Sequence, residues 1–569
     1  MENFSLMFPQ GKSRELCTLT PEAENDLSIE FILDALSEDE YEKNLMRKIM
    51  VTVTDDEEII RYRCDVFEDF LRFPKLREEM SELLKKLADL REIERFQKDQ
   101  EASSLWMLIN RLREIDEYVG CITRIKEILE GLNIHSEGML SLKKIVTDIY
   151  SASGFPELKK DIDETFEKAR KLKSITIGVN LDNLLRPKNA GVVSLNDKEF
   201  TSSGLMKHFL RFTDNKDDLH HGTDVEELRK FHPANPSTSK VAFGTAQVAV
   251  NHSVHIETND LTGADPLSDA LKKSVTDILK RTVKDIKSTL KKYINISGYA
   301  LINLTPEIIF YIRWAELTDK IIAKKMPMCK AEIVSADKRE CSFKEIYNLK
   351  LAIKNVLGDN IDIVTNEMEF DDDKRIFILT GPNRGGKTIF TQAVGLAMLM
   401  AQWGVYVPAS KAVLSPCDNI YTHFPADENN TVDLGRLGEE SKRLSEIFDV
   451  ATQRSLLLLN ESLATTNVAE GLFIAKDVVK AMIYLGTRAI FNTHMHELAR
   501  CLDDLNAEVT CNSRAVSMIT GVHDGRRSFK ISIAPPQGVS YAKDIAVKYG
   551  VTYDIIKNHI DTKSKEKSD

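Results

Sequence analysis

The stretch from Ile376 to Thr391, IFILTGPNRGGKTIFT, restricts the possible folds more than any other part of this chain. Its first five residues predict a buried strand, a glycine-rich turn follows, and Lys387 and Thr388 begin a long apolar run typical of a helix. Glycines let backbone N–H groups converge on a phosphate, and the helix start adds the positive end of its dipole. The pattern therefore predicts a phosphate-binding loop formed by Gly381, Pro382, Asn383, Arg384, Gly385, Gly386, Lys387 and Thr388.

Two later strands are expected to end beside this loop. Ser455 to Leu459 is followed by Asn460 and Glu461, and Arg488 to Thr493 is followed by His494. In ATPases with such loops, the first strand ends in a group that holds Mg²⁺, and a glutamate then orients the attacking water. We therefore predict ATP and Mg²⁺ as cofactors, Thr388 and Asn460 as metal ligands, and Glu461 and His494 as catalytic residues.

Composition excludes some classes of protein and leaves others open. The chain of 569 residues predicts several domains, and its longest apolar runs are shorter than the ~18 residues of a membrane helix. The N-terminus shows no secretory signal, and the eight cysteines are scattered without a Cys-x-x-Cys pair, which favours reduced thiols in the cytoplasm. A net charge of −11 does not by itself indicate nucleic-acid binding, although a local basic surface is compatible with it.

Changes of pattern along the chain predict four segments. Residues 1–171 are expected to be helical, residues 172–262 to form a small insertion containing strands, residues 263–345 to return as helices and a connector, and residues 346–569 to form the nucleotide domain. Within the second segment, alternation predicts a strand from Ile175 to Val179, which Pro187 and Gly191 break, and further strands at Val192 to Leu195, Val241 to Val250 and Val254 to Ile256. Within the third segment, Pro266 to Ile296 predicts one long helix with many lysines on one face. That face either contacts a phosphate backbone or is simply solvated.

Several motifs together resemble the MutS family of DNA mismatch-repair ATPases. They are GPNRGGKT, the run from Trp403 to Ala409, LLLLNES followed by Thr465-Thr466 and Glu470-Gly471, and FNTHMHEL. The resemblance implies a multidomain α and α/β fold, in which a helical lever domain carries a small clamp insertion and precedes a C-terminal ABC-type ATPase domain. It also implies a homodimer in which each ATP site is completed by the partner, and a clamp that holds double-stranded DNA.

Three features depart from the family pattern. The position of the metal-binding carboxylate is Asn460, so hydrolysis is expected to be slow. The signature loop, Leu434 to Glu440, lacks its serine, although Gly435, Arg436 and Gly438 could supply N–H groups or charge. The sequence begins almost at once with lever-like helices, so we expect no direct reading of mismatches.

The sequence thus favours an ATP-dependent, dimeric DNA clamp with weak ATPase activity. A nucleotide-gated scaffold that binds RNA, the ribosome or a protein and hardly hydrolyses ATP is the alternative, favoured by Asn460 and the acidic composition. An enzyme acting on a small molecule is a third possibility, but no acceptor-substrate site is recognisable.

Overall fold

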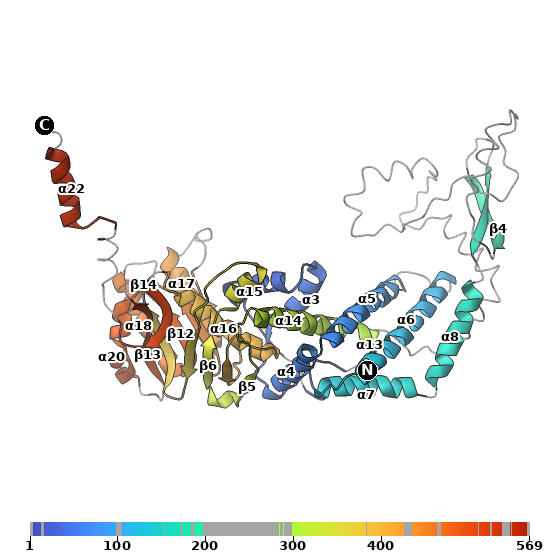
Figure 1. The fold of residues 1–569 in the computed structure, drawn as a ribbon, viewed down its shortest axis with the longest axis horizontal. Coiled ribbons are helices and arrows are strands. Elements are labelled where there is room, and N and C mark those ends of the chain that lie inside the picture. The colour runs from blue at the N-terminus through green and yellow to red at the C-terminus, as the bar shows by residue number, and fades with distance from the viewer. Residues whose placement is uncertain are drawn as a thin grey trace. The chain divides into compact units, whose positions relative to one another are not determined.

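A computed structural model gives the fold of the chain (Figure 1). It describes residues 4–12, 16–97, 105–152, 154–170, 173–181, 183, 187–196, 198, 284, 288, 299–382, 384–425, 435–463, 468–509, 511, 513–523, 526–536, 547 and 549–565. Unit 1 comprises Met1–Leu84, Ile125–Val146 and Asn303–Asp569, and unit 2 comprises Lys85–Arg124 and Thr147–Ile302. In the described part of the chain, no helix is long and apolar enough to span a membrane.

Unit 1 contains a six-stranded sheet in the order β10-β11-β12-β8-β13-β14. Its strands are β8 (Lys374–Thr380), β10 (Ile420–His423), β11 (Leu456–Asn460), β12 (Arg488–Asn492), β13 (Arg514–His523) and β14 (Arg526–Ile533). Neighbouring strands run parallel except for the antiparallel pair β13 and β14. Parallel strands place their carboxyl ends at one edge of a sheet, so the residues that follow β8, β11 and β12 meet there.

Helices cover both faces of this sheet (Figure 1). They are α16 (Lys387–Trp403), α17 (Gly435–Val450), α18 (Val468–Leu485), α19 (His496–Arg500) and α20 (Leu502–Glu508). Alternate strand residues such as Ile378 and Leu459 pack in one apolar cluster with α18, α19 and α20. On the other face α16 lies so close to β11 that a Cβ added to Gly395 would come within 2.6 Å of Leu458 Cδ1. The expectation of a mixed α/β domain is confirmed, and the three expected strands agree to within two residues at each end.

A second, four-stranded sheet in unit 1 has the order β5-β9-β6-β7. Its strands are β5 (Ala331–Ile333), β6 (Cys341–Ile346), β7 (Asn366–Phe370) and β9 (Lys411–Leu414), and the short 3-10 helix η2 (Ala336–Lys338) follows β5. The pair β5 and β9 is parallel, and the other two pairs are antiparallel.

The rest of unit 1 is mainly helical. Its elements are β1 (Cys17–Thr18), α1 (Pro21–Asp26), α2 (Ile29–Leu36), α3 (Glu40–Met50), β2 (Thr52–Val53), α4 (Glu57–Arg72), α14 (Thr305–Ala323), α15 (Leu349–Leu357) and α22 (Tyr553–Lys565), and α7 (Glu137–Ser151) begins in it. Helix α14 is buried on most sides and packs on α2, α3, α4 and α15. Trp314 of α14 lies against Trp403 at the end of α16, with ring centroids 5.7 Å apart. Helical and nucleotide-domain segments therefore share one core.

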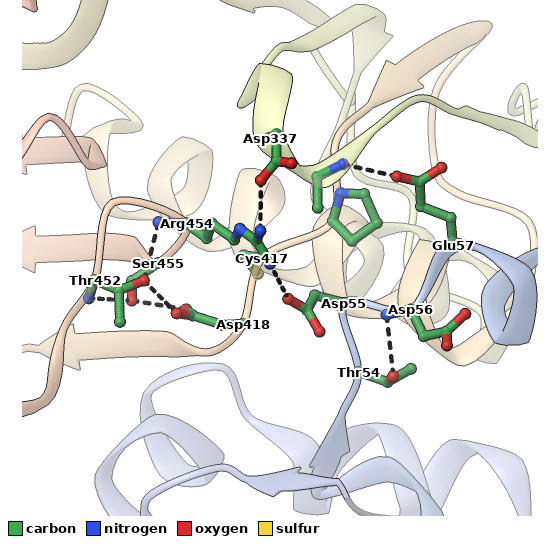
Figure 2. Close-up of polar contacts among 12 residues, drawn as sticks. Thr54, Asp55, Asp56, Glu57, Asp337, Cys417, Asp418, Thr452, Arg454 and Ser455 are labelled. Carbon is green, nitrogen blue, oxygen red and sulfur yellow. Dashed lines mark hydrogen bonds and ion pairs between the residues drawn. The ribbon is translucent and has the colours of Figure 1, made fainter. Parts of the chain in front are cut away.

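Figure 2 shows a polar network at the start of β11. The guanidinium group of Arg454 contacts Asp55, just before α4, at 3.1 Å through Nη1, and it contacts Asp337 of η2 through Nη2. Beside it, Asp418 accepts a 2.7 Å hydrogen bond from the hydroxyl group of Ser455. The beginning of α4 is thus tied to the turn that precedes β11.

Unit 2 combines helices with a two-stranded sheet. It contains α8 (Gly154–Arg170), α13 (Tyr299–Ile302), the C-terminal part of α5 (Pro74–Gln97), and the strands β3 (Ser174–Leu181) and β4 (Pro187–Asn196). Helix α6 (Leu105–Glu130) begins in unit 2 and ends in unit 1. Strands β3 and β4 pair antiparallel as a hairpin, and Gly178 faces Gly191. The first two expected strands are present, but Pro187 and Gly191 do not break the chain before the second one: β4 begins at Pro187 and contains Gly191. Proline is tolerated there because a first strand residue need not donate to the ladder.

Other expectations for the central part of the chain fall outside the described residues. They concern the strands from Val241 to Val250 and from Val254 to Ile256, and the helix from Pro266 to Ile296 apart from residues 284 and 288.

Candidate nucleotide-binding site

The glycine-rich loop joins the end of β8 to the start of α16, at the carboxyl edge of the six-stranded sheet. Gly381 has a φ of 145°, and a Cβ there would lie 2.0 Å from Thr520 Oγ1 of β13. Gly386 precedes the first residue of α16 as its N-cap, and its φ of 90° lies in the left-handed region. Both positions therefore require glycine, the first for close packing and the second for its backbone angle. Asn383 of this loop lies outside the described residues.

Lys387 is buried, and its ammonium group lies inside the loop. Its Nζ donates hydrogen bonds to the carbonyl oxygens of Gly381 at 3.0 Å and Pro382 at 3.2 Å. Burial lowers the pKa of Lys387 to about 8, while the negative charge of Glu461 acts in the opposite direction. A buried cation whose hydrogen-bond partners among the described residues are neutral carbonyl groups strongly attracts a phosphate group.

Thr388, the first-turn residue after Lys387, reaches the end of β11. Its hydroxyl group donates a 2.9 Å hydrogen bond to Oδ1 of Asn460. The side-chain amide of Asn492, at the end of β12, donates to the same oxygen. Three segments distant in sequence thus bring two candidate oxygen ligands, from Thr388 and Asn460, into direct contact.

Glu461 and His494 also meet at this edge. Strand β12 lies between β8 and β11, so His494 emerges between the loop and Glu461. His494 Nε2 is 2.7 Å from Glu461 Oε1. This hydrogen bond lowers the pKa of the Glu461 carboxyl group below its ordinary value, and the nearby Lys387 contributes to the lowering. Glu461 is therefore an ionised hydrogen-bond acceptor at neutral pH.

A cavity of about 410 Å³ adjoins the loop. Its lining includes the loop residues Arg384 to Thr388 and Glu461, together with Ile346, Tyr347, Asn348, Leu351, Ile361, Asp362, Val364, Asn366, Ile389, Phe390, Ala393 and Phe529. Phe529, from β14, packs over the loop, and a Cβ on Gly386 would lie 3.3 Å from its ring. A mostly apolar pocket with a few polar groups suits the flat base of a nucleotide, with the phosphates in the loop.

The structure brings together all the described site residues expected from sequence, and it adds others. Asn492 lies within the FNTHMHEL motif but was assigned no role, and Phe529 lies in no motif; each reaches the site because its strand lies in the same sheet. The place of Asn492 in that motif, two residues before His494, was a signal that could have found it. Nothing in the sequence around Phe529 indicates that it belongs to the site.

Comparison with known protein families gives matches over two regions of the chain. A model of the MutS2 N-terminal domain matches residues 55–324, and a model of MutS domain V matches residues 377–558. The chain belongs to the MutS family. The domain V match begins within β8 and includes Lys387, Asn460, Glu461 and His494, so the family assignment and the candidate site coincide in the chain.

Individual MutS-family relatives match over shorter stretches. The DNA mismatch repair protein MutS of Chlorobium chlorochromatii is 32% identical over 192 residues, which are 34% of this chain and 22% of that protein. Endonuclease MutS2 of Thermus thermophilus is 29% identical over 216 residues, 38% of this chain and 28% of that protein. The DNA mismatch repair protein MutS of Thermotoga neapolitana is 39% identical over 137 residues, 24% of this chain and 17% of that protein. The matched regions thus span less than a third of each of these relatives.

The described part of the stretch expected to be the signature loop, Gly435 to Glu440, forms the start of α17. Its two glycines, Gly435 and Gly438, therefore lie at a helix N-terminus. In the same helix, the carboxylate of Glu440 accepts a 2.6 Å hydrogen bond from the N–H group of Leu463, two residues after Glu461.

Proposed function

We propose that this protein is a MutS-type ATPase that hydrolyses ATP slowly, works as a homodimer and couples nucleotide binding to a clamp on double-stranded DNA. The observation that carries the proposal is the meeting of Lys387, Thr388, Asn460, Glu461 and His494 at one sheet edge beside a cavity of nucleoside size. This combination of a buried cation, paired oxygen ligands and an ionised carboxylate suits phosphoryl transfer to water.

Each residue has a role that follows from its position. The ammonium group of Lys387 and the loop N–H groups would bind the phosphates, and Phe529 would pack on the base. The ionised carboxylate of Glu461 would accept a hydrogen bond from the attacking water and orient it. His494, in contact with Glu461, would hold that carboxylate beside the terminal phosphate.

Two side-chain oxygen atoms beside the loop are suited to bind a Mg²⁺ ion together with the nucleotide. Thr388 Oγ1 and Asn460 Oδ1 are 2.9 Å apart, and both are oxygen donors of the kind Mg²⁺ uses beside phosphates and water. Bound there, the ion would neutralise charge on the phosphates. Because Asn460 supplies a neutral oxygen, the protein would hold the ion less strongly than a carboxylate would.

DNA binding and dimerisation are proposed from family membership and from the site. Relatives named DNA mismatch repair protein MutS and Endonuclease MutS2 support DNA as the ligand. A partner that supplies its α17 helix start to the terminal phosphate would complete the site, since α17 begins with glycines. We propose that the clamp contacts DNA phosphates and does not distinguish a mismatch from a perfect pair.

Replacing Lys387 tests nucleotide binding. Lys387→Ala removes the buried cation and should abolish binding of a fluorescent ATP analogue measured by anisotropy. Lys374→Ala is the matched control, since Lys374 is an exposed lysine at the start of the same strand, β8, paired with Asp371. Equal binding by the parent and Lys387→Ala would show that this site is wrongly assigned.

One observation favours a second function, a nucleotide-gated scaffold that binds RNA, the ribosome or a protein. Asn460 is neutral, and its Oδ1 already accepts hydrogen bonds from Thr388 and Asn492. Such an arrangement suits tight nucleotide binding with little turnover. Identification of the nucleic acid or protein that co-purifies with the chain would distinguish the scaffold from the DNA clamp.

A further inference from the structure

The turn formed by residues 461–463, which follows β11, has an unfavourable backbone conformation. Glu461 and Leu463 have φ angles of 53° and 63°, in the left-handed region that non-glycine residues rarely adopt. Such angles persist only where the surrounding structure holds them, and they are common at functional sites. Contacts that hold residues 461–463 therefore determine where the Glu461 carboxylate points.

Each residue of this turn has a partner from a different element. The N–H group of Glu461 donates to the carbonyl oxygen of Asn492 at 2.7 Å, which anchors it to β12. Ser462 Oγ lies 2.6 Å from His423 Nδ1 and donates to the carbonyl oxygen of His423 at 3.1 Å, which anchors it to the end of β10. The N–H group of Leu463 donates to the carboxylate of Glu440 at 2.6 Å, which anchors it to α17.

The contact between His423 and Ser462 is shielded from water. The exposed fractions of the two residues are 1% and 2%. Burial, with a contribution from the positive charge of Arg443, lowers the pKa of His423 to about 4. The imidazole is therefore neutral at physiological pH and acts as a fixed hydrogen-bonding group next to the turn.

We infer that His423 and Glu440 are positioning residues that hold the 461–463 turn so that the Glu461 carboxylate stays against His494. Neither side chain needs to touch the nucleotide, because each acts through the backbone or side chain of the residue next to Glu461. Removing either contact lets the turn relax toward ordinary φ angles, and this moves the carboxylate away from the attacking water.

Glu440 also links the turn to the first turns of α17. Glu440 lies about one to two turns from Gly435, the first residue of α17. Its hydrogen bond to the N–H group of Leu463 therefore connects the start of this helix to the turn that contains Glu461. This inference rests on the proposed function, in which Glu461 orients water for ATP hydrolysis.

Steady-state ATPase assays of Glu440→Ala and His423→Leu test the inference. We expect kcat to fall at least about tenfold, since small misplacements of a catalytic group have large effects, while KM and affinity for an ATP analogue stay within about twofold. His423→Asn should restore much of the kcat, because an Asn amide can take the place of Nδ1. Glu446→Ala is the control, since Glu446 lies further along α17 in an exposed pair with Lys442.

A double-mutant cycle separates positioning from general damage. In a Glu461→Gln background, the Glu440 and His423 variants should lower the residual kcat by less than about twofold, because the group they position is already removed. Equal kcat losses in both backgrounds, or an unchanged kcat in the single variants, would overturn the inference while leaving the proposed ATPase intact. A parent protein with no ATP turnover would overturn both.

Discussion

The hydroxyl group of Thr388 donates a 2.9 Å hydrogen bond to Oδ1 of Asn460, and the Asn492 amide donates to the same oxygen. Both donors are neutral, and both would be equally satisfied by a carboxylate oxygen. An aspartate at position 460 would therefore keep the local hydrogen bonds and add a negative charge beside the metal position.

Asn460→Asp should raise ATP turnover and lower the Mg²⁺ concentration at half-maximal rate. A tenfold gain in turnover corresponds to a decrease of ~1.4 kcal/mol in the activation free energy. This is less than the attraction of about 4 kcal/mol between two unit charges at close range near a protein surface. Steady-state ATPase titrated with Mg²⁺ measures both quantities, with Asn460→Ala as the control that removes the oxygen. An Asp variant with the parent's turnover and Mg²⁺ midpoint would instead favour the nucleotide-gated scaffold.

Glu461→Gln should bind ATP, hydrolyse it only at a small residual rate, and accumulate as a closed dimer. The amide keeps the shape of the side chain and the hydrogen bond to His494, but it is a poor acceptor for the water proton. Sedimentation velocity with and without ATP measures the assembly. If neither the parent nor the variant changes in mass or shape with nucleotide, each site is complete within one chain and the composite site is excluded.

DNA affinity should fall steeply with salt and should be the same for a perfect duplex and one with a single mismatch. If 6–10 phosphates are contacted, affinity drops by about 10³ or more between 50 and 200 mM salt. Lys284 is exposed and lies within the lysine-rich stretch from Pro266 to Ile296, so Lys284→Glu should reduce the salt slope. Lys442→Glu, on α17, is the control. A clear preference for mismatched DNA would contradict the proposed clamp.

His423 should make folding stability depend on pH below neutrality. Its folded pKa of about 4 is below the ordinary histidine pKa of 6.5, so the unfolded state binds more protons between these two pH values. The stability of the folded state is therefore complete above about pH 6.5 and decreases as pH falls toward 4, by up to about 3 kcal/mol. Urea unfolding of the parent and His423→Asn at pH 7 and 5 measures the difference. Parallel losses in the two proteins would show that His423 is not the cause.

Two arginines at one corner of unit 1 should differ in their effect on stability. Arg454 pairs with Asp55 and Asp337 on the surface, so Arg454→Ala should cost less than about 1 kcal/mol (Figure 2). Arg488 is fully buried and donates to three backbone carbonyl groups, so Arg488→Met should cost about 3 kcal/mol or more. Chemical denaturation measures both, and a larger loss for Arg454→Ala would show that its network couples α4 to β11 more strongly than surface pairs do.

Local patterns were sufficient to predict the loop, its strand and helix, and the polar residues that end the next strands. These signals are local: the glycines of the loop, the apolar run of β11 and the alternation in β3 each span only a few residues. The sequence therefore determines the loop and these strands without information from distant segments. That Asn460, Glu461 and His494 share an edge follows from parallel strands alone.

Strand order and partners from distant segments required the tertiary structure. The sequence does not show that β12 lies between β8 and β11, and this order is what brings His494 against Glu461 and Asn492 against Asn460. Phe529 over the loop and His423 against Ser462 likewise depend on which elements pack together. Packing between distant elements depends on burial and shape complementarity across the whole domain. The sequence therefore determined which chemical groups stand at the end of each strand. Only the tertiary structure decided which of these groups are in contact.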